Sequence, residues 1–205
     1  MKSPIEDTIW GASYGSVAAV QAAFDRFGPE YHDAILASGA PAGAAQALMS
    51  HLNPDAQGID FGCGSGVLGI ALRALGLKKP LDGLDVSAGM LELAHQTGCY
   101  RELRQANLLL TESYPKASGV SYDFAISMGL VGDYVPYYLA LPHIVQTLRP
   151  GGFLGFAVES RSTPWRPLEK LLTDLGLTTL SETILPVPEG KLTAQSYHFY
   201  VAQIR

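Results

Sequence analysis

Short apolar runs alternate with segments of helical periodicity from residue 57 to the end of the chain. We predict strands from the short runs, and helices where apolar residues recur every three or four positions. The predicted strands cover residues 57–61, 81–84, 100–105, 122–127, 153–158, 177–184 and 195–204. The predicted helices cover residues 67–75, 87–95, 136–148 and 164–175. This alternation indicates βαβ units and therefore a mostly parallel sheet.

The two ends of the chain depart from this alternation. No helical pattern separates the last two predicted strands, which flank a turn at residues 186–190, so we expect an antiparallel hairpin. Residues 13–53 lack strand signals and predict two or three helices that cover the open edge of the sheet. The expected fold class is α/β: a Rossmann-like doubly wound sheet, mostly parallel with one antiparallel C-terminal strand, and a helical N-terminal cap. We predict one compact domain, with the cap or lid at residues 1–53 and the core at residues 54–205.

The composition narrows the class of protein. Of the 205 residues 47% are apolar, which is enough for a sizeable core, and the formal net charge is −5. Because the chain has no basic stripe, we expect no nucleic-acid partner. The two cysteines and five histidines lack the spacing of metal ligands, so we expect no metal. The absence of a signal peptide pattern and of a membrane-length apolar run predicts a soluble, cytoplasmic protein without membrane contacts.

A glycine-rich turn follows the first predicted strand. Glycines at positions 62, 64 and 66 let the backbone turn sharply and approach a ligand closely. A phosphate-binding dinucleotide loop has the pattern G-x-G-x-x-G, but the sixth position after this start is Val67. A P-loop needs a lysine that this turn lacks. Both phosphate-binding interpretations are therefore weakened.

A carboxylate ends the second predicted strand. Asp85 stands 25 residues after Asp60, which precedes the glycine turn. A carboxylate at this strand end can accept hydrogen bonds from both hydroxyls of a ribose. Because ligands of open parallel sheets bind beyond the carboxyl ends of the strands, the turn and Asp85 together predict a nucleoside site.

Four segments resemble, in order and spacing, the successive motifs of class I S-adenosylmethionine-dependent methyltransferases. These segments are residues 59–69, 84–91, 122–125 and 148–152. Residues 24–32 also resemble a helix of small-molecule methyltransferases, including those named after the Williams–Beuren syndrome region. The resemblance implies S-adenosylmethionine as cofactor, S-adenosylhomocysteine as product and a small-molecule acceptor. This cofactor carries a sulfonium cation and no phosphate, which agrees with a site made of carboxylates and backbone amides.

The resemblance also implies roles at the methionine end of the cofactor. The backbone at Gly62, Cys63 and Gly64 would pack against the methionine part. Asp60 would hold the turn and face the ammonium group, and Tyr31 would close over the carboxylate.

At the other end, the resemblance implies that Asp85 binds the ribose and that Val86 and Met90 enclose the adenine. Asn107, with Leu108 beside it, replaces the aspartate that the family usually has near the adenine amine, and its amide oxygen can still accept that hydrogen bond. Ser127 and Met128 would line the point of methyl transfer.

The acceptor is less well defined by the sequence. The segment Ser127–Leu130 differs from the D/N-P-P-Y/F motif of enzymes that methylate planar amino nitrogens. The candidate catalytic residues are His32, Asp133, Tyr134 and Glu159. Aromatic residues before position 32 are suited to cover an apolar pocket, which favours a small apolar acceptor methylated on oxygen, carbon or nitrogen.

Several alternatives stay open. A protein of this fold can keep the cofactor and catalyse a non-methylating reaction, such as a cyclisation or pericyclic step. It can also serve as a non-catalytic partner subunit, although the intact glycine turn disfavours this role. An NAD-dependent oxidoreductase would share the carboxylate at Asp85, and Val67 argues against it. We expect a monomer or a homodimer.

Overall fold

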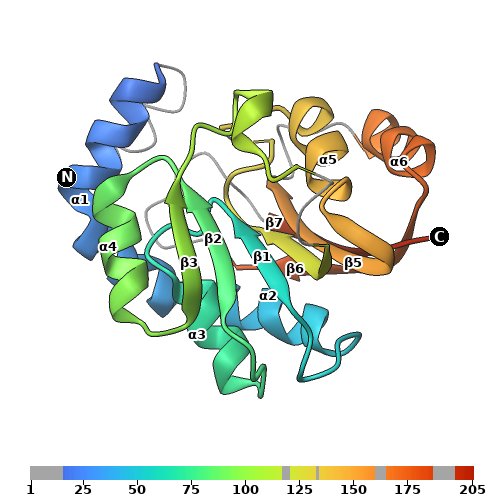
Figure 1. Ribbon diagram of the computed structural model, residues 1–205, viewed down its shortest axis with the longest axis horizontal. Coiled ribbons are helices and arrows are strands. Elements are labelled where there is room, and N and C mark those ends of the chain that lie inside the picture. The colour runs from blue at the N-terminus through green and yellow to red at the C-terminus, as the bar shows by residue number, and fades with distance from the viewer. Residues whose placement is uncertain (1–15, 117–120, 133, 160–164, 187–196) are drawn as a thin grey trace.

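The computed structural model describes residues 16–116, 121–132, 134–159, 165–186 and 197–205, and its centre is a seven-stranded sheet (Figure 1). The strand order is β3-β2-β1-β4-β5-β7-β6. The strands are β1 (Gly58–Phe61), β2 (Leu81–Asp85), β3 (Tyr100–Gln105), β4 (Tyr122–Ser127), β5 (Leu148–Glu159), β6 (Leu177–Leu185) and β7 (Tyr197–Ile204). The order reverses between β1 and β4, and the ends of these two strands form the crevice in which such folds bind ligands.

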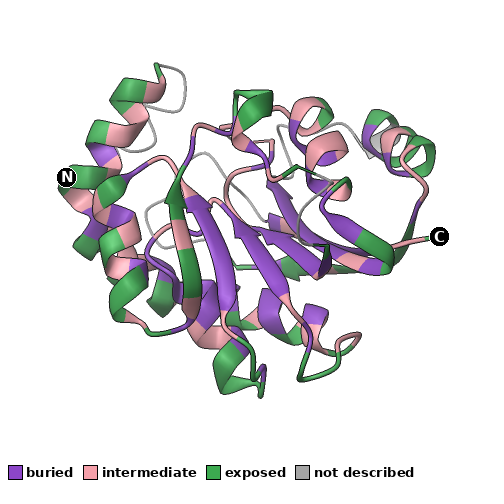
Figure 2. Cartoon of the chain, viewed as in Figure 1, coloured by how far each residue is buried: buried purple, intermediate pink, exposed green. Residues whose placement is uncertain are grey.

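The strand pairing confirms the predicted fold class. Each pair among β3, β2, β1, β4 and β5 is parallel. Strand β7 runs antiparallel between β5 and β6, so the sheet contains the single antiparallel strand that was expected at the C-terminal end. The outer strand β3 exposes charged side chains such as Arg101 and Glu102, which discourage pairing with another chain (Figure 2).

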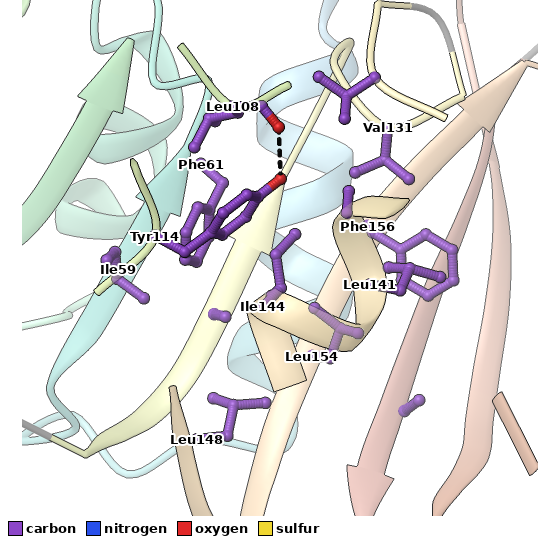
Figure 3. Close-up of a cluster of buried hydrophobic side chains, with 14 of the residues drawn as sticks. Ile59, Phe61, Leu108, Tyr114, Val131, Leu141, Ile144, Leu148, Leu154 and Phe156 are labelled. Atoms are coloured by element: carbon purple, nitrogen blue, oxygen red, sulfur yellow. Dashed lines mark hydrogen bonds between the residues drawn. The ribbon is translucent and has the colours of Figure 1, made fainter. Parts of the chain in front are cut away.

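Helices cover both faces of the sheet. The helices are α1 (Val17–Ser38), α2 (Ala40–Met49), α3 (Val67–Ala74), α4 (Ala88–Gln96), α5 (Tyr137–Val145) and α6 (Trp165–Asp174), and Thr111–Ser113 form one 3₁₀ turn, η2. Leu141 of α5 and Leu168 of α6 belong to the apolar core on one face, part of which Figure 3 shows. Leu48 of α2 and Leu72 of α3 belong to the core on the other face. Among the described residues, no helix is long and apolar enough to cross a membrane.

The sequence pattern predicted that the N-terminal helices cover the open edge of the sheet. The structure places them elsewhere. Helix α1 packs on α4, whereas α2 lies beside α3 on the face formed by β6 and β7. Small residues explain this position of α2. Ala44 and Ala45 are fully buried, and a side chain at Gly43 would come within 2.8 Å of Leu185. Helix α2 therefore approaches the sheet closely enough to be part of the core.

One predicted boundary is wrong. The helix expected at 136–148 ends at Val145, and the expected stop at 149–152 lies inside β5. Leu148 already pairs with Tyr122, and a register shift then precedes the pairing of Phe153 with Phe124. The segment looked like a turn because residues 149–152 read Arg-Pro-Gly-Gly, and in the structure they form the irregular first part of a strand.

Candidate functional site

A pocket lies at the carboxyl ends of β1 to β4. It encloses about 840 Å³ of empty space, part of which is open to solvent. Its walls come from α1, the glycine turn, the end of β2, the loop after β3 and the segment after β4. Among the described lining residues, the titratable side chains are Tyr31, Asp85 and Tyr134, and none is basic. The pocket is therefore apolar with one carboxylate.

In the glycine turn, backbone atoms rather than side chains line this pocket. Gly62, Gly64 and Gly66 have φ values of 75°, 52° and 82°, in the left-handed region that glycine adopts without strain. The N–H groups of Gly62 and Cys63 donate to the carbonyl of Leu84, at 2.8 and 3.0 Å, and this fixes the turn against the end of β2. Gly62 and Gly64 line the pocket, and the Cys63 side chain is buried behind it. Burial raises the pKa of the Cys63 thiol well above its ordinary value, so the thiol stays protonated.

Asp85 joins the turn to the start of α4. One carboxylate oxygen accepts the N–H of Gly64 at 2.8 Å, and the other accepts the N–H of Ser87 at 2.9 Å. Burial raises the pKa of Asp85, and these backbone hydrogen bonds oppose the shift. Each carboxylate oxygen has a second lone pair, so the fixed carboxylate can still accept hydrogen bonds from a ligand.

Asp60 lies beneath the turn rather than in the pocket wall. Its side chain is 1% exposed, and one carboxylate oxygen accepts the hydroxyl of Tyr100 at 2.8 Å. Burial raises the pKa of Asp60 to about 7, the hydrogen bond from Tyr100 opposes the rise, and the nearby Asp85 adds to it. The sequence did not point to Tyr100, because its position in the run 100–105 indicated only a strand.

A mainly apolar part of the pocket extends from Asp85 along the loop after β3. Val86, Met90, Asn107 and Leu108 line it. The amide oxygen of Asn107 accepts the N–H of Leu109 at 3.1 Å. Figure 3 shows how the loop is held from below: the hydroxyl of the buried Tyr114 donates to the carbonyl of Leu108 at 2.8 Å.

The opposite wall is formed by side chains of α1 and of the segment after β4. Phe24 makes edge-on ring contacts with Tyr31 and Tyr134, at centroid distances of 5.1 and 5.9 Å. Met128 lines this part of the pocket. Ser127 does not line the pocket, because its buried hydroxyl points to the neighbouring strand and donates to the carbonyl of Phe61 at 2.9 Å.

Of the four candidate catalytic residues, Tyr134 lines the pocket. The structure does not bring His32 there. Its Nδ1 is 2.9 Å from the hydroxyl of the buried Ser65, and its ring faces a separate surface groove between α1, α3 and α4. Asp133 and the side chain of Glu159 lie outside the described residues.

Helix α1 is attached to the start of α4 through Asp25, a contact that the sequence did not indicate. The hydroxyl of Ser87 and the N–H of Gly89 donate to the same carboxylate oxygen of Asp25, at 2.5 and 3.0 Å. The bond from Ser87 is the main reason why the pKa of Asp25 is lowered. The helix bends at Phe27, where φ is −111° and ψ is 15°.

Comparisons with known proteins give the family. Residues 59–152 match a family model described as a methyltransferase domain. The chain is 31% identical over 183 residues to the human protein called methyltransferase-like protein 27, a match that covers 85% of this chain and 73% of that protein. The chain belongs to the class I S-adenosylmethionine-dependent methyltransferases. S-adenosylmethionine is therefore its cofactor.

Other similar proteins match over a shorter segment or at lower identity. A ribosomal protein L11 methyltransferase from Shewanella denitrificans is 34% identical over 103 residues, which is 50% of this chain and 33% of that protein. Magnesium protoporphyrin IX methyltransferase from Synechocystis, solved with bound S-adenosylmethionine, has a TM-score of 0.61 at 18% identity and covers 96% of this chain and 89% of that chain. The [4+2]-cyclase SpnF has a TM-score of 0.67 at 14% identity, with 92% and 96% covered. At such low identity, the two structures support the fold alone.

The pocket fits the family's cofactor. A ribose would find a hydrogen-bond acceptor in Asp85, and an adenine would find apolar side chains in Val86, Met90 and Leu108. The amino acid part needs close backbone approach, which the left-handed glycines allow. The sulfonium and ammonium charges favour a site with carboxylates withdrawn from solvent. Asp60 is buried and Asp85 is partly buried.

Proposed function

We propose that the protein transfers the methyl group of S-adenosylmethionine to an oxygen, carbon or nitrogen of a small apolar molecule. One observation carries this proposal: the pocket that begins at Asp85 and the glycine turn continues into a wall of apolar side chains. Val17, Val20 and Phe24 of α1 face this space together with Leu130 and Val135. An acceptor held there would adjoin the methionine end of the cofactor and be shielded from water.

The cofactor would be bound along the turn and the ends of β2 and β3. In this proposal Asp85 binds the ribose hydroxyls, and Val86, Met90, Asn107 and Leu108 surround the adenine. Gly62, Cys63 and Gly64 form the backbone surface for the methionine part, with Asp60 beneath them and Tyr31 above the carboxylate. The short distances from Asp85 to the N–H groups of Gly64 and Ser87 support this arrangement, because they hold the carboxylate at the pocket wall.

Methyl transfer is a direct displacement, in which the acceptor bonds to the methyl carbon as the carbon–sulfur bond breaks and its electron pair returns to sulfur. The cofactor supplies the reactive methyl group, so the chain mainly aligns the acceptor and excludes water. We propose that Tyr134, which the aromatic contact with Phe24 holds in the wall, orients the acceptor. Asp133 and Glu159 are the proposed acceptors of a proton where the substrate must lose one.

The proposed function gives each part of the chain a role. Within the predicted cap or lid of residues 1–53, α1 would close the acceptor side. Helix α2, which packs in the core, would belong with residues 54–205 to the cofactor-binding core. The attachment of α1 to Ser87 and Gly89 supports a cap that is fixed next to the cofactor site.

The first experiment is calorimetric titration with S-adenosylmethionine, S-adenosylhomocysteine and NAD. Micromolar binding of the first two, without binding of NAD, is the expected result. The protein is then incubated with the cofactor and a panel of apolar phenols, amines and acids. Mass spectrometry of the products tests for the mass gain of one methylene unit. Binding of neither sulfur ligand would overturn the proposal.

A second candidate keeps the cofactor and changes the chemistry. The apolar wall suits a molecule that cyclises in a shaped pocket as well as it suits a methyl acceptor. A product with rearranged bonds and unchanged mass, formed only with cofactor present, would support this non-methylating reaction. A protein that binds the cofactor, converts no acceptor and copurifies with a second methyltransferase chain would instead be a partner subunit.

A further inference from the structure

The side chain of Tyr100 lies in a slot made by three glycines. Tyr100 begins β3, and its ring passes beneath the glycine turn. A Cβ atom would come within 3.0 Å of this ring at Gly66, 2.8 Å at Gly69 and 2.9 Å at Gly83. These glycines belong to the turn, α3 and β2, so three separate elements leave room for one ring. A larger residue at any of them would displace the ring.

The slot aims the hydroxyl of Tyr100 at Asp60. The oxygen atoms are 2.8 Å apart, and the carboxylate of Asp60 is almost completely buried. Burial raises the pKa of Tyr100 well above its ordinary value, so the phenol keeps its proton and donates the hydrogen bond. A hydrogen bond donated to a carboxylate favours the ionised form of that carboxylate.

The other titratable groups near Asp60 do not neutralise it. Among the described residues, these are Asp85 at the end of β2 and Cys63 in the turn, with Tyr100 itself on β3. Asp85 repels the charge of Asp60, and the Cys63 thiol is uncharged. The hydrogen bond from Tyr100 is thus the local contact that favours ionisation of Asp60, and burial opposes it.

We propose that Tyr100 is a positioning residue that favours the ionised form of Asp60 beneath the glycine turn and thereby sets the pH range in which the positively charged cofactor binds. The inference rests on the proposed cofactor site. The carboxylate attracts the ammonium and sulfonium groups across a few ångströms of low-dielectric protein, and its protonated form does not. Because the pKa of Asp60 is about 7, the change falls within the physiological range.

The test compares the wild-type protein with Tyr100→Phe, which keeps the ring in its slot and removes the hydroxyl. The affinity for S-adenosylmethionine is measured by calorimetry from pH 6 to pH 9. The amino group of the ligand titrates near pH 8, but this affects both proteins equally and cancels in the ratio of their affinities. We expect the variant to bind about tenfold more weakly at pH 7 and below, and the ratio to approach one at pH 9.

A matched control is Tyr122→Phe. Tyr122 also donates to a buried aspartate at 2.8 Å, but its partner is Asp82, whose other contact is the ion pair with Arg101. This variant loses an equivalent hydrogen bond outside the pocket lining. We expect it to lose stability and to keep the wild-type pH profile of cofactor binding.

Several results would overturn the inference. A Tyr100→Phe protein with the wild-type profile, or with an equal loss of affinity at every pH, would assign Tyr100 a purely structural role. If this variant does not fold, Asp60→Asn takes its place, because its side chain is uncharged at every pH. A wild-type pH profile in that variant would contradict the inference. Failure of the wild-type protein to bind either sulfur ligand would instead refute the proposed function.

Discussion

The two sides of the pocket are lined by different kinds of chemical group. The cofactor side combines apolar side chains at Val86, Met90 and Leu108 with backbone and carboxylates in fixed hydrogen bonds. Asp85 accepts two backbone N–H groups, and Asp60, beneath the turn, accepts the hydroxyl of Tyr100. The acceptor side consists of apolar and aromatic side chains from α1 and from the segment after β4. Backbone geometry can be maintained while side chains change. The comparison therefore suggests that cofactor binding is sensitive to a few positions and that acceptor choice depends on many.

The largest effect is expected at the glycine turn. Gly64→Val places a branched side chain at φ 52° in the pocket wall, so it should reduce the affinity for S-adenosylmethionine by about 100-fold or more. Calorimetry measures the affinity, and circular dichroism confirms the fold. Gly98→Val is the matched control, since Gly98 has φ 66° and open space around it, remote from the pocket. Unchanged binding by Gly64→Val would mean that the turn is not the cofactor site.

Asp85→Ala should have the next largest effect. Loss of two charge-assisted hydrogen bonds to the ribose should weaken cofactor binding by about 2 kcal/mol, roughly 30-fold in Kd. The exposed Asp55, which pairs with Lys78, provides the control Asp55→Ala. Equal affinities of the two variants would remove the ribose assignment.

A substitution on the acceptor side should lower turnover of the acceptor without an equal loss of cofactor affinity. Phe24→Ala removes the ring that contacts both Tyr31 and Tyr134. We expect turnover of an acceptor to fall about tenfold, as for loss of roughly 1.4 kcal/mol of packing, while cofactor affinity changes less than threefold. Leu36→Ala, an exposed apolar position on the same helix, should change neither quantity. Equal losses in cofactor affinity and turnover would show that the two sides are not separable.

The smallest effect concerns the stability of the ligand-free protein. The folded protein raises the pKa of Asp60 from 3.8 to about 7, so this group contributes stability at low pH that is lost as the pH rises toward and through 7. We expect the ligand-free Tm to fall by about 5 °C between pH 5 and pH 8, and the Asp60→Asn protein to show a flatter profile. Scanning calorimetry of both proteins decides this, and parallel profiles would rule out Asp60 as the cause.

The sequence predicted the parts of the fold that depend on local pattern. The strands Tyr100–Gln105 and Tyr122–Ser127 have the predicted bounds. The helix predicted at residues 87–95 is α4, whose N-cap Ser87 accepts the N–H of Met90. The glycine turn and Asp85 lie together because consecutive parallel strands end at the same edge of the sheet. These features follow from neighbours in the sequence.

Features that depend on distant residues could not be predicted in this way. The slot of Tyr100 needs Gly66, Gly69 and Gly83, and nothing in their sequence spacing relates them to one tyrosine. The contact of Asp25 with Ser87 joins residues 62 positions apart. His32 reaches Ser65 instead of the pocket because consecutive residues of a helix point about 100° apart, and its neighbour Tyr31 takes the pocket side.

The position of α1 has a consequence for how such a protein can acquire new specificity. This helix provides Val17, Val20 and Phe24 to the pocket, yet it packs mainly on α4 and not on the sheet. Its side chains can thus be exchanged with little disturbance of the central core. A library of variants at these three positions, grafted onto an unchanged core, is a direct route to enzymes that use the same cofactor on different molecules.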